Sequence, residues 1–400
     1  MSARFLHRDS PWLLAVLAAL VAVGPLSVDM YIPAMPLMMT ALDTDISHMH
    51  LTLSSYLAGF ALFHLVCGPL ADRIGRKPVL LGGGALFAAA CLGCSYSTSV
   101  EELLLFRFLQ GVGACVGPTI GRTIARDMFG PTDAARALSL IAMLMALAPA
   151  VAPTLGGVLL LWLPWPFIFL FLALYGAATL LLVTRFLPES LPVKQSLHPV
   201  IIARNYALLL RDPTYLTATV GSGCIYAGLM TYISCSSFVY IDMLGVPVQL
   251  FGFIFLSSVI GYMLGSALSA RLTRSHAAEW TVLFGASLNT GACSVMLLGG
   301  YLLPQNIWVL ILPMLFYAAG MGLVLPNAMA VALRPFPHIA GTASALLGFV
   351  QMTISGSATA LVGLFLLDTP MPMLVAMFGA TLLALALCVV LFRRRERAHP

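Results

Sequence analysis

The chain has 400 residues, of which 60% are apolar and only 9% are charged. Soluble domains carry about a quarter charged residues, so this composition excludes a soluble protein and indicates an integral membrane protein. The net charge of +5 does not indicate a nucleic-acid partner, because the basic residues are spread over separate short connections between apolar runs.

Windows of about 20 residues, the length that crosses a bilayer, predict twelve spanning helices. The run from Trp12 to Met35 is too long for the core of a signal peptide, so we interpret it as a retained first span. Twelve spans place both termini on one side. We therefore predict an all-α membrane protein with cytoplasmic termini, whose spans are centred near Ala22, Ala61, Phe87, Gly113, Leu147, Leu174, Ile225, Gly261, Gly291, Ala318, Leu347 and Leu383.

Charge divides the connections into two classes, as the positive-inside rule requires. The connections assigned to the outside hold acids and no Lys or Arg: Asp43, Asp45, Glu101, Glu102, Asp242 and Asp368. Basic residues fall on the other side: Arg4, Arg8, Arg73, Arg76, Lys77, Arg122, Arg126, Arg136, Arg185, Lys194, Arg204, Arg211, Arg271, Arg274, Arg334 and the arginines from Arg393 to Arg397.

The longest polar connection, 188–214, predicts a cytoplasmic linker between two six-helix halves, 1–187 and 215–400. Within it, apolar residues alternate with basic ones over 200–211, which predicts a short helix in the inner interface. Aligning Arg73 with Arg271 also places Arg76 on Arg274, a faint internal repeat. Two six-helix halves around a midplane site are the architecture of alternating-access carriers.

Asp29 is the only acid well inside a predicted span. A carboxylate there costs at least about 2.5 to 3.5 kcal/mol, and desolvation favours its neutral form, so it could load and release a proton. The alternative is a helix-end residue in the outer interface, since Pro33 follows closely. We favour proton coupling, because an ionisable group within a span indicates a functional site.

Arg107 lies in the fourth span, roughly 9 Å below the outer surface and at a depth similar to that of Asp29. The two side chains could pair directly or through water, and the alternative for Arg107 is a snorkelling side chain. We favour a buried charge that biases Asp29 towards its ionised form.

Small residues mark the fourth and fifth spans. Gly113, Gly117 and Gly121 form a stripe that permits close helix packing. In the fifth span, two prolines predict a kinked helix that could seal one half against the other, and the residues of this pattern are Pro149, Pro153, Gly156 and Gly157.

Residues 68–77 (GPLADRIGRK) predict a conformational latch rather than a plain charged loop. Asp72 could accept from a helix N-terminus, while Arg73 and Arg76 could pair with acids such as Asp127. The predicted latch consists of Gly68, Asp72, Arg73, Gly75, Arg76, Lys77, Arg126 and Asp127.

Polar and aromatic residues within the spans are candidates for the wall of a substrate cavity, although most such residues are core packing. The candidates are Asp29, Tyr31, Tyr56, Phe60, Phe63, Tyr226, Tyr232, Tyr317 and Gln351. The eight cysteines fall in apolar spans without metal-ligand spacing, so we expect packing roles and no metal. Without HExxH, GxSxG or a carboxylate pair within the spans, we expect no catalytic residue and no enzyme.

Three motifs bring a resemblance to the major facilitator superfamily: residues 68–77, 107–113 (RFLQGVG) and 152–157 (APTLGG) resemble its signature loop, its fourth-span motif and its antiporter motif. Residues 26–36 and 335–344 resemble the bicyclomycin-resistance (Bcr/CflA) subfamily of drug:proton antiporters. Two features depart from the pattern: Ala152 stands where the antiporter motif has Gly, and Ser236-Ser237 where many relatives read Gly-Pro.

The resemblance implies a monomeric inner-membrane carrier that exports small drugs or metabolites in exchange for protons, without a cofactor. It also implies proton coupling at Asp29 and Arg107. Related multidrug transporters carry a second acid where this chain has Val21, so we expect a simple proton stoichiometry. The alternatives are a proton symporter that imports a nucleoside or similar metabolite and, from another class, a membrane protein without transport activity.

Overall fold

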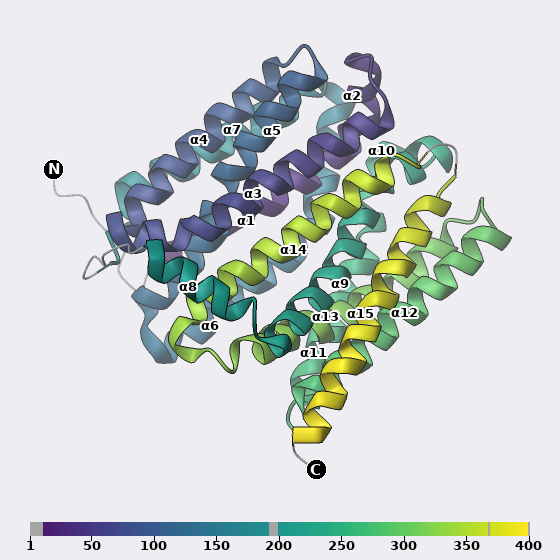
Figure 1. Cartoon of the computed structure of the whole chain (residues 1–400). Helices are drawn as coiled ribbons and strands as arrows, with labels where there is room; N and C mark the ends of the chain where they lie inside the picture. Colours follow the sequence, from purple (N-terminus) through teal and green to yellow (C-terminus); the bar gives the residue numbers. More distant parts are fainter. Residues whose placement is uncertain (1–10, 192–198, 367–368, 399–400) are drawn as a thin grey trace. The chain divides into compact units, whose positions relative to one another are not determined.

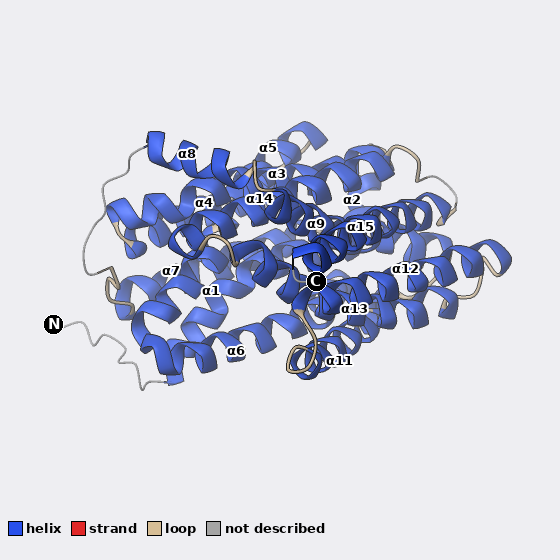
Figure 2. Cartoon of the chain, turned by 60° about the horizontal axis from the view of Figure 1, so that its bottom comes forward, coloured by secondary structure: helices blue, strands red, loops and turns tan. Residues whose placement is uncertain are grey.

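The structure is a computed structural model that describes residues 11–191, 199–366 and 369–398, with backbone alone at 11, 130–140, 142–146, 199 and 394–398. Figure 1 shows the helices in chain order, and Figure 2 shows helices and loops and no strand over these ranges. The all-α prediction is confirmed for this part of the chain. Arg4, Arg8, Lys194, Asp368 and the side chain of Arg136 lie outside the described residues.

The chain divides into two compact units, one built from the residues up to Asp43 and Ser55–Pro199, the other from Thr44–Ser54 and the residues from Val200 onward. The helices before the linker are α1 (Pro11–Asp29), η1 (Ile32–Ala34), α2 (Met35–Ala41), α3 (Ile46–Ile74), α4 (Arg76–Tyr96), α5 (Val100–Ala114), α6 (Val116–Trp162) and α7 (Pro166–Phe186). Those of the second unit are α8 (Pro199–Leu209), α9 (Pro213–Ser237), η2 (Phe238–Met243), α10 (Val248–Ile254), α11 (Leu256–Leu272), α12 (Ala278–Leu302), α13 (Trp308–Leu333), η3 (Pro337–Ile339), α14 (Ala340–Gly363) and α15 (Met371–Ala398).

Eleven helical segments of the described residues are long and apolar enough to cross a membrane. They contain every predicted span centre except Leu147, which begins a shorter apolar stretch, Leu147–Trp162, in the second part of α6. The prediction of a multi-pass membrane protein is confirmed. The twelfth span and the side of the termini stay predictions. The helix predicted in the linker is present as α8, and its Val200 and Ile201 side chains are exposed.

The connection between the predicted fourth and fifth spans differs from expectation, since α6 is helical from Val116 to Trp162 where we expected a turn. Gly117 packs on the Leu20 backbone and Gly156 on the Met30 backbone. A straight helix would separate these two glycines by about 58 Å, whereas Leu20 and Met30 are about 15 Å apart along α1. Therefore α6 reverses direction, and both of its arms flank α1.

A break separates α5 from α6 at Cys115. Pro118 has no backbone N–H, so it cannot donate to the Ala114 carbonyl, and its ring crowds that carbonyl. The break lies within one predicted span, on the glycine stripe. Because of this break, Arg107 on α5 and the glycines of α6 can contact different neighbouring helices.

Glycines bring helices into backbone contact at the same place in each half. An added Cβ at Gly59 would overlap the Phe108 carbonyl and one at Gly111 the Tyr56 carbonyl, which joins α3 to α5. In the second unit, α11 meets α13 in the same manner, through Gly261 on Leu315 and Gly265 on Ala319. These are the second and fourth predicted spans of each half, so the internal repeat extends to packing.

We expect Gly117→Ala to lower the free energy of unfolding by about 1 to 3 kcal/mol, because its Cβ would overlap the Leu20 carbonyl and force the helices apart. Gly82→Ala is the matched control, since Gly82 lies in α4 with no atom within 4 Å of an added Cβ. It should be neutral or stabilising by up to about 1 kcal/mol. Thermal unfolding in detergent measures both, and equal stability of the two variants would contradict the contact.

Candidate functional site

Arg107 is fully buried in α5, whose first turn is capped by Ser99 and carries Glu101 and Glu102. One terminal nitrogen (Nη1) of its guanidinium donates to the Ser27 carbonyl at 3.2 Å and to Gln110 Oε1 at 2.5 Å. Gln110 in turn donates to Cys91 Sγ at 3.1 Å. The guanidinium is therefore held at a fixed position between α1 and α4.

Two aromatic rings flank the same guanidinium. Its central carbon lies 4.3 Å from the centre of the Tyr31 ring and 4.6 Å from that of the Tyr56 ring, within the range of cation–π attraction. Burial of one charge costs several kcal/mol, and a desolvated cation–π contact contributes about 2 kcal/mol. The rings and the two acceptors offset part of this cost without an acid, whereas Nε and Nη2 are buried and have no hydrogen-bond partner among the described residues.

Asp29 ends α1 and is only 5% exposed. No described residue donates a hydrogen bond to it or forms an ion pair with it, so the direct contact with Arg107 that depth permits is absent. Arg107 contacts Ser27 and Tyr31, which are four residues apart and share a helix face, whereas Asp29 lies between them on the opposite side. Arg107, on α5, thus contacts the end of α1 that carries Asp29 without pairing with Asp29.

The antiporter motif packs on this helix end. An added Cβ at Gly156 would lie 2.5 Å from the Met30 carbonyl and 3.1 Å from the Pro33 ring. Pro149 and Pro153 both lie within the helical part of α6, and Thr154 Oγ1 donates to the Ala150 carbonyl at 2.7 Å. The motif thus contacts the residue that follows Asp29 directly.

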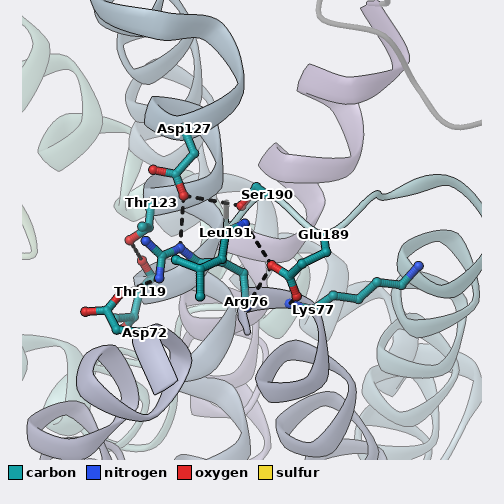
Figure 3. Close-up of polar contacts among 9 residues, drawn as sticks. All are labelled: Asp72, Arg76, Lys77, Thr119, Thr123, Asp127, Glu189, Ser190 and Leu191. Carbon is teal, nitrogen blue, oxygen red and sulfur yellow. Dashed lines mark hydrogen bonds and ion pairs between the residues drawn. The ribbon is translucent and has the colours of Figure 1, made fainter. Parts of the chain in front are cut away.

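Arg76 is the centre of the predicted latch, which Figure 3 shows. Its Nη1 atom lies 2.5 Å from Asp72 Oδ1, and its Nε atom lies 2.9 Å from Asp127 Oδ2. Asp127 also accepts from Ser190 Oγ at 3.3 Å. The predicted pairing of Arg76 with Asp127 is present, and it joins α4 to α6.

Glu189 adds a second set of contacts that the sequence reasoning missed. Its carboxylate accepts the backbone N–H groups of Arg76 at 3.0 Å and Lys77 at 3.1 Å, so it caps the N-terminus of α4 (Figure 3). Gly75 has a φ of 117°, and an added Cβ would lie 2.5 Å from Glu189 Oε2. Lys77 Nζ donates to the carbonyls of Thr184 and Leu187 at the end of α7. The ends of α4 and α7 therefore hold each other.

Three predictions for the latch differ from the structure, either because the partner is another group or because the predicted residue makes no contact. Asp72 accepts from Arg76 and not from a helix N-terminus, because Glu189 already occupies that position. Arg73 and Arg126 are exposed and have no ion pair with any residue that the structure describes. Gly68 has no atom within 4 Å of an added Cβ. One feature of the sequence could have pointed to Glu189. It is an acid directly after the sixth span, on the side of the membrane to which the basic connections were assigned.

We expect Glu189→Gln to destabilise the start of α4 by about 1 kcal/mol, because a neutral amide loses the attraction to the helix dipole and offers one acceptor oxygen for several donors. Amide hydrogen exchange at Arg76 and Lys77 should become faster. The control is Glu102→Gln, which accepts from the Thr98 N–H at the start of α5 and should leave α4 unchanged. Unaltered exchange in Glu189→Gln would refute the capping role.

The predicted cavity residues of the first unit lie near Arg107. Phe60 is buried beside Tyr56, with ring centres 6.3 Å apart, and stacks on His64 at 5.9 Å. The His64 ring lies 3.3 Å from Thr119 Oγ1. Phe63 is only half-buried. A row of aromatic side chains therefore leads along α3 from Arg107 towards His64.

In the second unit, the predicted cavity residues differ in environment. Tyr232 and Tyr317 are fully buried; the Tyr232 hydroxyl lies 2.9 Å from that of Tyr240, and Tyr317 donates to the Ile225 carbonyl at 2.6 Å. This is core packing rather than a cavity wall. Gln351 is half-buried and donates to Ser222 Oγ at 3.2 Å, and Tyr226 is half-buried. These two stay predictions for a substrate contact.

All eight cysteines are free and buried, as the packing interpretation expects. No group of three or more His, Cys, Asp or Glu side chains within the described residues could hold a metal ion.

A family model described as Major Facilitator Superfamily matches residues 17–360. The chain belongs to the Major Facilitator Superfamily. Among its relatives, the "Bicyclomycin resistance protein homolog" of Haemophilus influenzae is 31% identical over 90% of this chain and 91% of that protein. "Multidrug resistance protein D" of Escherichia coli is 29% identical over 86% of both. The predicted resemblance to this superfamily and to bicyclomycin-resistance proteins is confirmed.

Solved structures show the same superfamily fold. The structure titled as a peptide transporter POT in complex with sulfate covers 99% of this chain and 97% of its own, with a TM-score of 0.79 and 17% identity. The D-xylose-proton symporter covers 96% of this chain and 97% of its own, with a TM-score of 0.74 and 13% identity. At such identities the likeness concerns the fold alone. The chain is a multi-pass membrane transporter.

Proposed function

We propose that this superfamily member exports small drug-like or metabolite molecules across the bacterial inner membrane in exchange for protons, by alternating access of its two halves. The observation that carries the proposal is Asp29, a carboxylate buried within a span without a hydrogen-bond or ion-pair partner among the described residues. An acid in such a place costs stability and is suited to exchange a proton. The names of the bicyclomycin and multidrug resistance relatives support drug-like compounds as substrates.

Arg107 and the latch have distinct proposed roles. Arg107 contacts the end of α1 that carries Asp29, through the Ser27 carbonyl, and would favour the ionised form of Asp29 through its charge rather than through a direct bond. The latch at the cytoplasmic ends of α4, α6 and α7 would stabilise one conformation of the first half. The carrier needs no cofactor, acts as a monomer and is not an enzyme in this proposal.

Proton release tests the proposal directly. The purified protein in weakly buffered detergent near neutral pH receives bicyclomycin, phenicols, nucleosides and amino acids in turn. We expect one class to displace a proton, because substrate and proton would compete for the same state. Substrate binding without any proton release would overturn the exchange mechanism.

The direction of flux separates the proposal from a proton symporter. In proteoliposomes with an imposed pH gradient, an antiporter moves substrate against the direction of proton flow, and a symporter moves it in the same direction. Binding without gradient-dependent flux in either direction would instead favour a protein without transport activity.

A further inference from the structure

The second unit contains a cavity of about 550 Å³, a volume typical of sites for drug-sized molecules. It lies where η2, the end of α12 and the start of α15 meet, together with Ile46 at the start of α3. By the charge of the connections, this end of the unit is predicted to face outward. None of the residues placed at the proton-coupling site lines it.

Among the residues that the structure describes, which exclude Asp368, one carboxylate lines this cavity and no Lys or Arg does. Asp242 is exposed at this cavity and has no hydrogen-bond or ion-pair partner among the described residues. It lies in η2, a stretch of π-helix that also places Phe238, four residues earlier, in the cavity wall. A widened helical turn is a frequent feature of functional sites.

The rest of the wall is apolar and aromatic, with a few uncharged polar groups. Phe238 is 1% exposed and forms a closed side, whereas Tyr301 is 73% exposed at the opening. Gln305 and Thr369 are the uncharged polar side chains. Such a wall accepts an apolar body, and the single unpaired acid leaves one position for a positive charge.

We propose that this cavity binds an organic cation with an apolar body, whose positive centre lies beside Asp242 and whose body contacts Phe238 and Ile46. The aromatic rings add cation–π attraction, and the acidic connections on this side of the protein attract cations. The site is separate from Asp29, so this inference does not rest on the proposed export function.

Equilibrium dialysis with tetraphenylphosphonium on the full-length protein in detergent tests the site. We expect wild type to bind the cation, and Asp242→Asn to weaken the affinity of one class of sites about five- to tenfold. Asp242→Glu, which keeps the carboxylate, should bind close to wild type. Gln305→Trp should block the opening and lower occupancy. Glu101→Gln is the matched control, because it removes another predicted outer acid, on α5, that does not line the cavity.

Further measurements make the result specific. Triphenylphosphine oxide, which has the same apolar body without a net charge, should bind at least about fivefold more weakly than the cation. Asp29→Asn should keep the Asp242-dependent class of sites, which separates this inference from the proton-exchange proposal. If Asp242→Asn unfolds at the same temperature as wild type, the variant retains its fold. Absence of cation binding by wild type, or equal binding by wild type and Asp242→Asn, would overturn the site.

Discussion

Asp29→Asn is expected to abolish proton-driven export while the protein stays folded. The variant removes a buried acid within a span that has no partner among the described residues, so the carrier would retain substrate binding and lose its coupling to the gradient. Because a buried carboxylate costs about 2.5 to 3.5 kcal/mol, thermal stability should be unchanged or higher. Accumulation of substrate in proteoliposomes under an imposed pH gradient measures the effect.

A single exchanging carboxylate also limits how far transport can go. One proton crossing a gradient of one pH unit releases about 1.4 kcal/mol, which sustains an accumulation of at most about tenfold for a neutral substrate. We expect wild type to reach no more than this ratio per pH unit. Asp45→Asn, at an exposed outer acid, is the control and should accumulate normally. Undiminished accumulation by Asp29→Asn would remove Asp29 from the mechanism.

Arg107→Met is expected to lose transport and to keep or gain thermal stability. The charge is fully buried without an acid, and replacing a buried charge with an apolar side chain of similar length is commonly neutral or stabilising. Arg107→Lys should also lower the transport rate by about tenfold or more, because a compact ammonium cannot lie flat between Tyr31 and Tyr56 while it reaches both acceptors.

The control for Arg107 is Arg185→Met, which removes an exposed arginine at the end of α7. It should leave transport and stability unchanged. A combination of normal transport with lower stability in Arg107→Met would show that Arg107 is a structural residue. The thermal transition and the initial export rate must therefore be measured on the same preparations.

The spans were readable from the sequence because they depend on local properties. Hydropathy over about 20 residues found the apolar segments. The break at Cys115 was not predicted, although Pro118 marks it through its missing donor. The turn expected between the fourth and fifth spans has a helical backbone instead, although Gly130 and Pro131, the residue types least favourable to a helix, lie in it. Reversal of the chain there is visible only through the contacts of Gly117 and Gly156 with α1.

The site was readable only where partners are chemically obvious. Asp127 was the natural acid for Arg76, whereas the contact of Asp72 with Arg76 was not predicted, because it joins the end of α3 to the start of α4 across Gly75. Glu189 lies 113 residues from Arg76 along the chain, so only the packing of α4 on α7 reveals it as a cap. The rings around Arg107 come from α3 and from the segment after α1, and no spacing rule brings them together.

Backbone contact through glycines limits where this protein can change during evolution. Where α3 touches α5 and α11 touches α13, the main chains meet directly, so no side chain is present to vary and the spacing is inherited with the glycines themselves. Diversity in the compounds that such carriers accept must then arise at positions outside these contacts. Because the two pairs correspond in chain order, they repeat one packing arrangement in both halves although the likeness of the two half-sequences is faint.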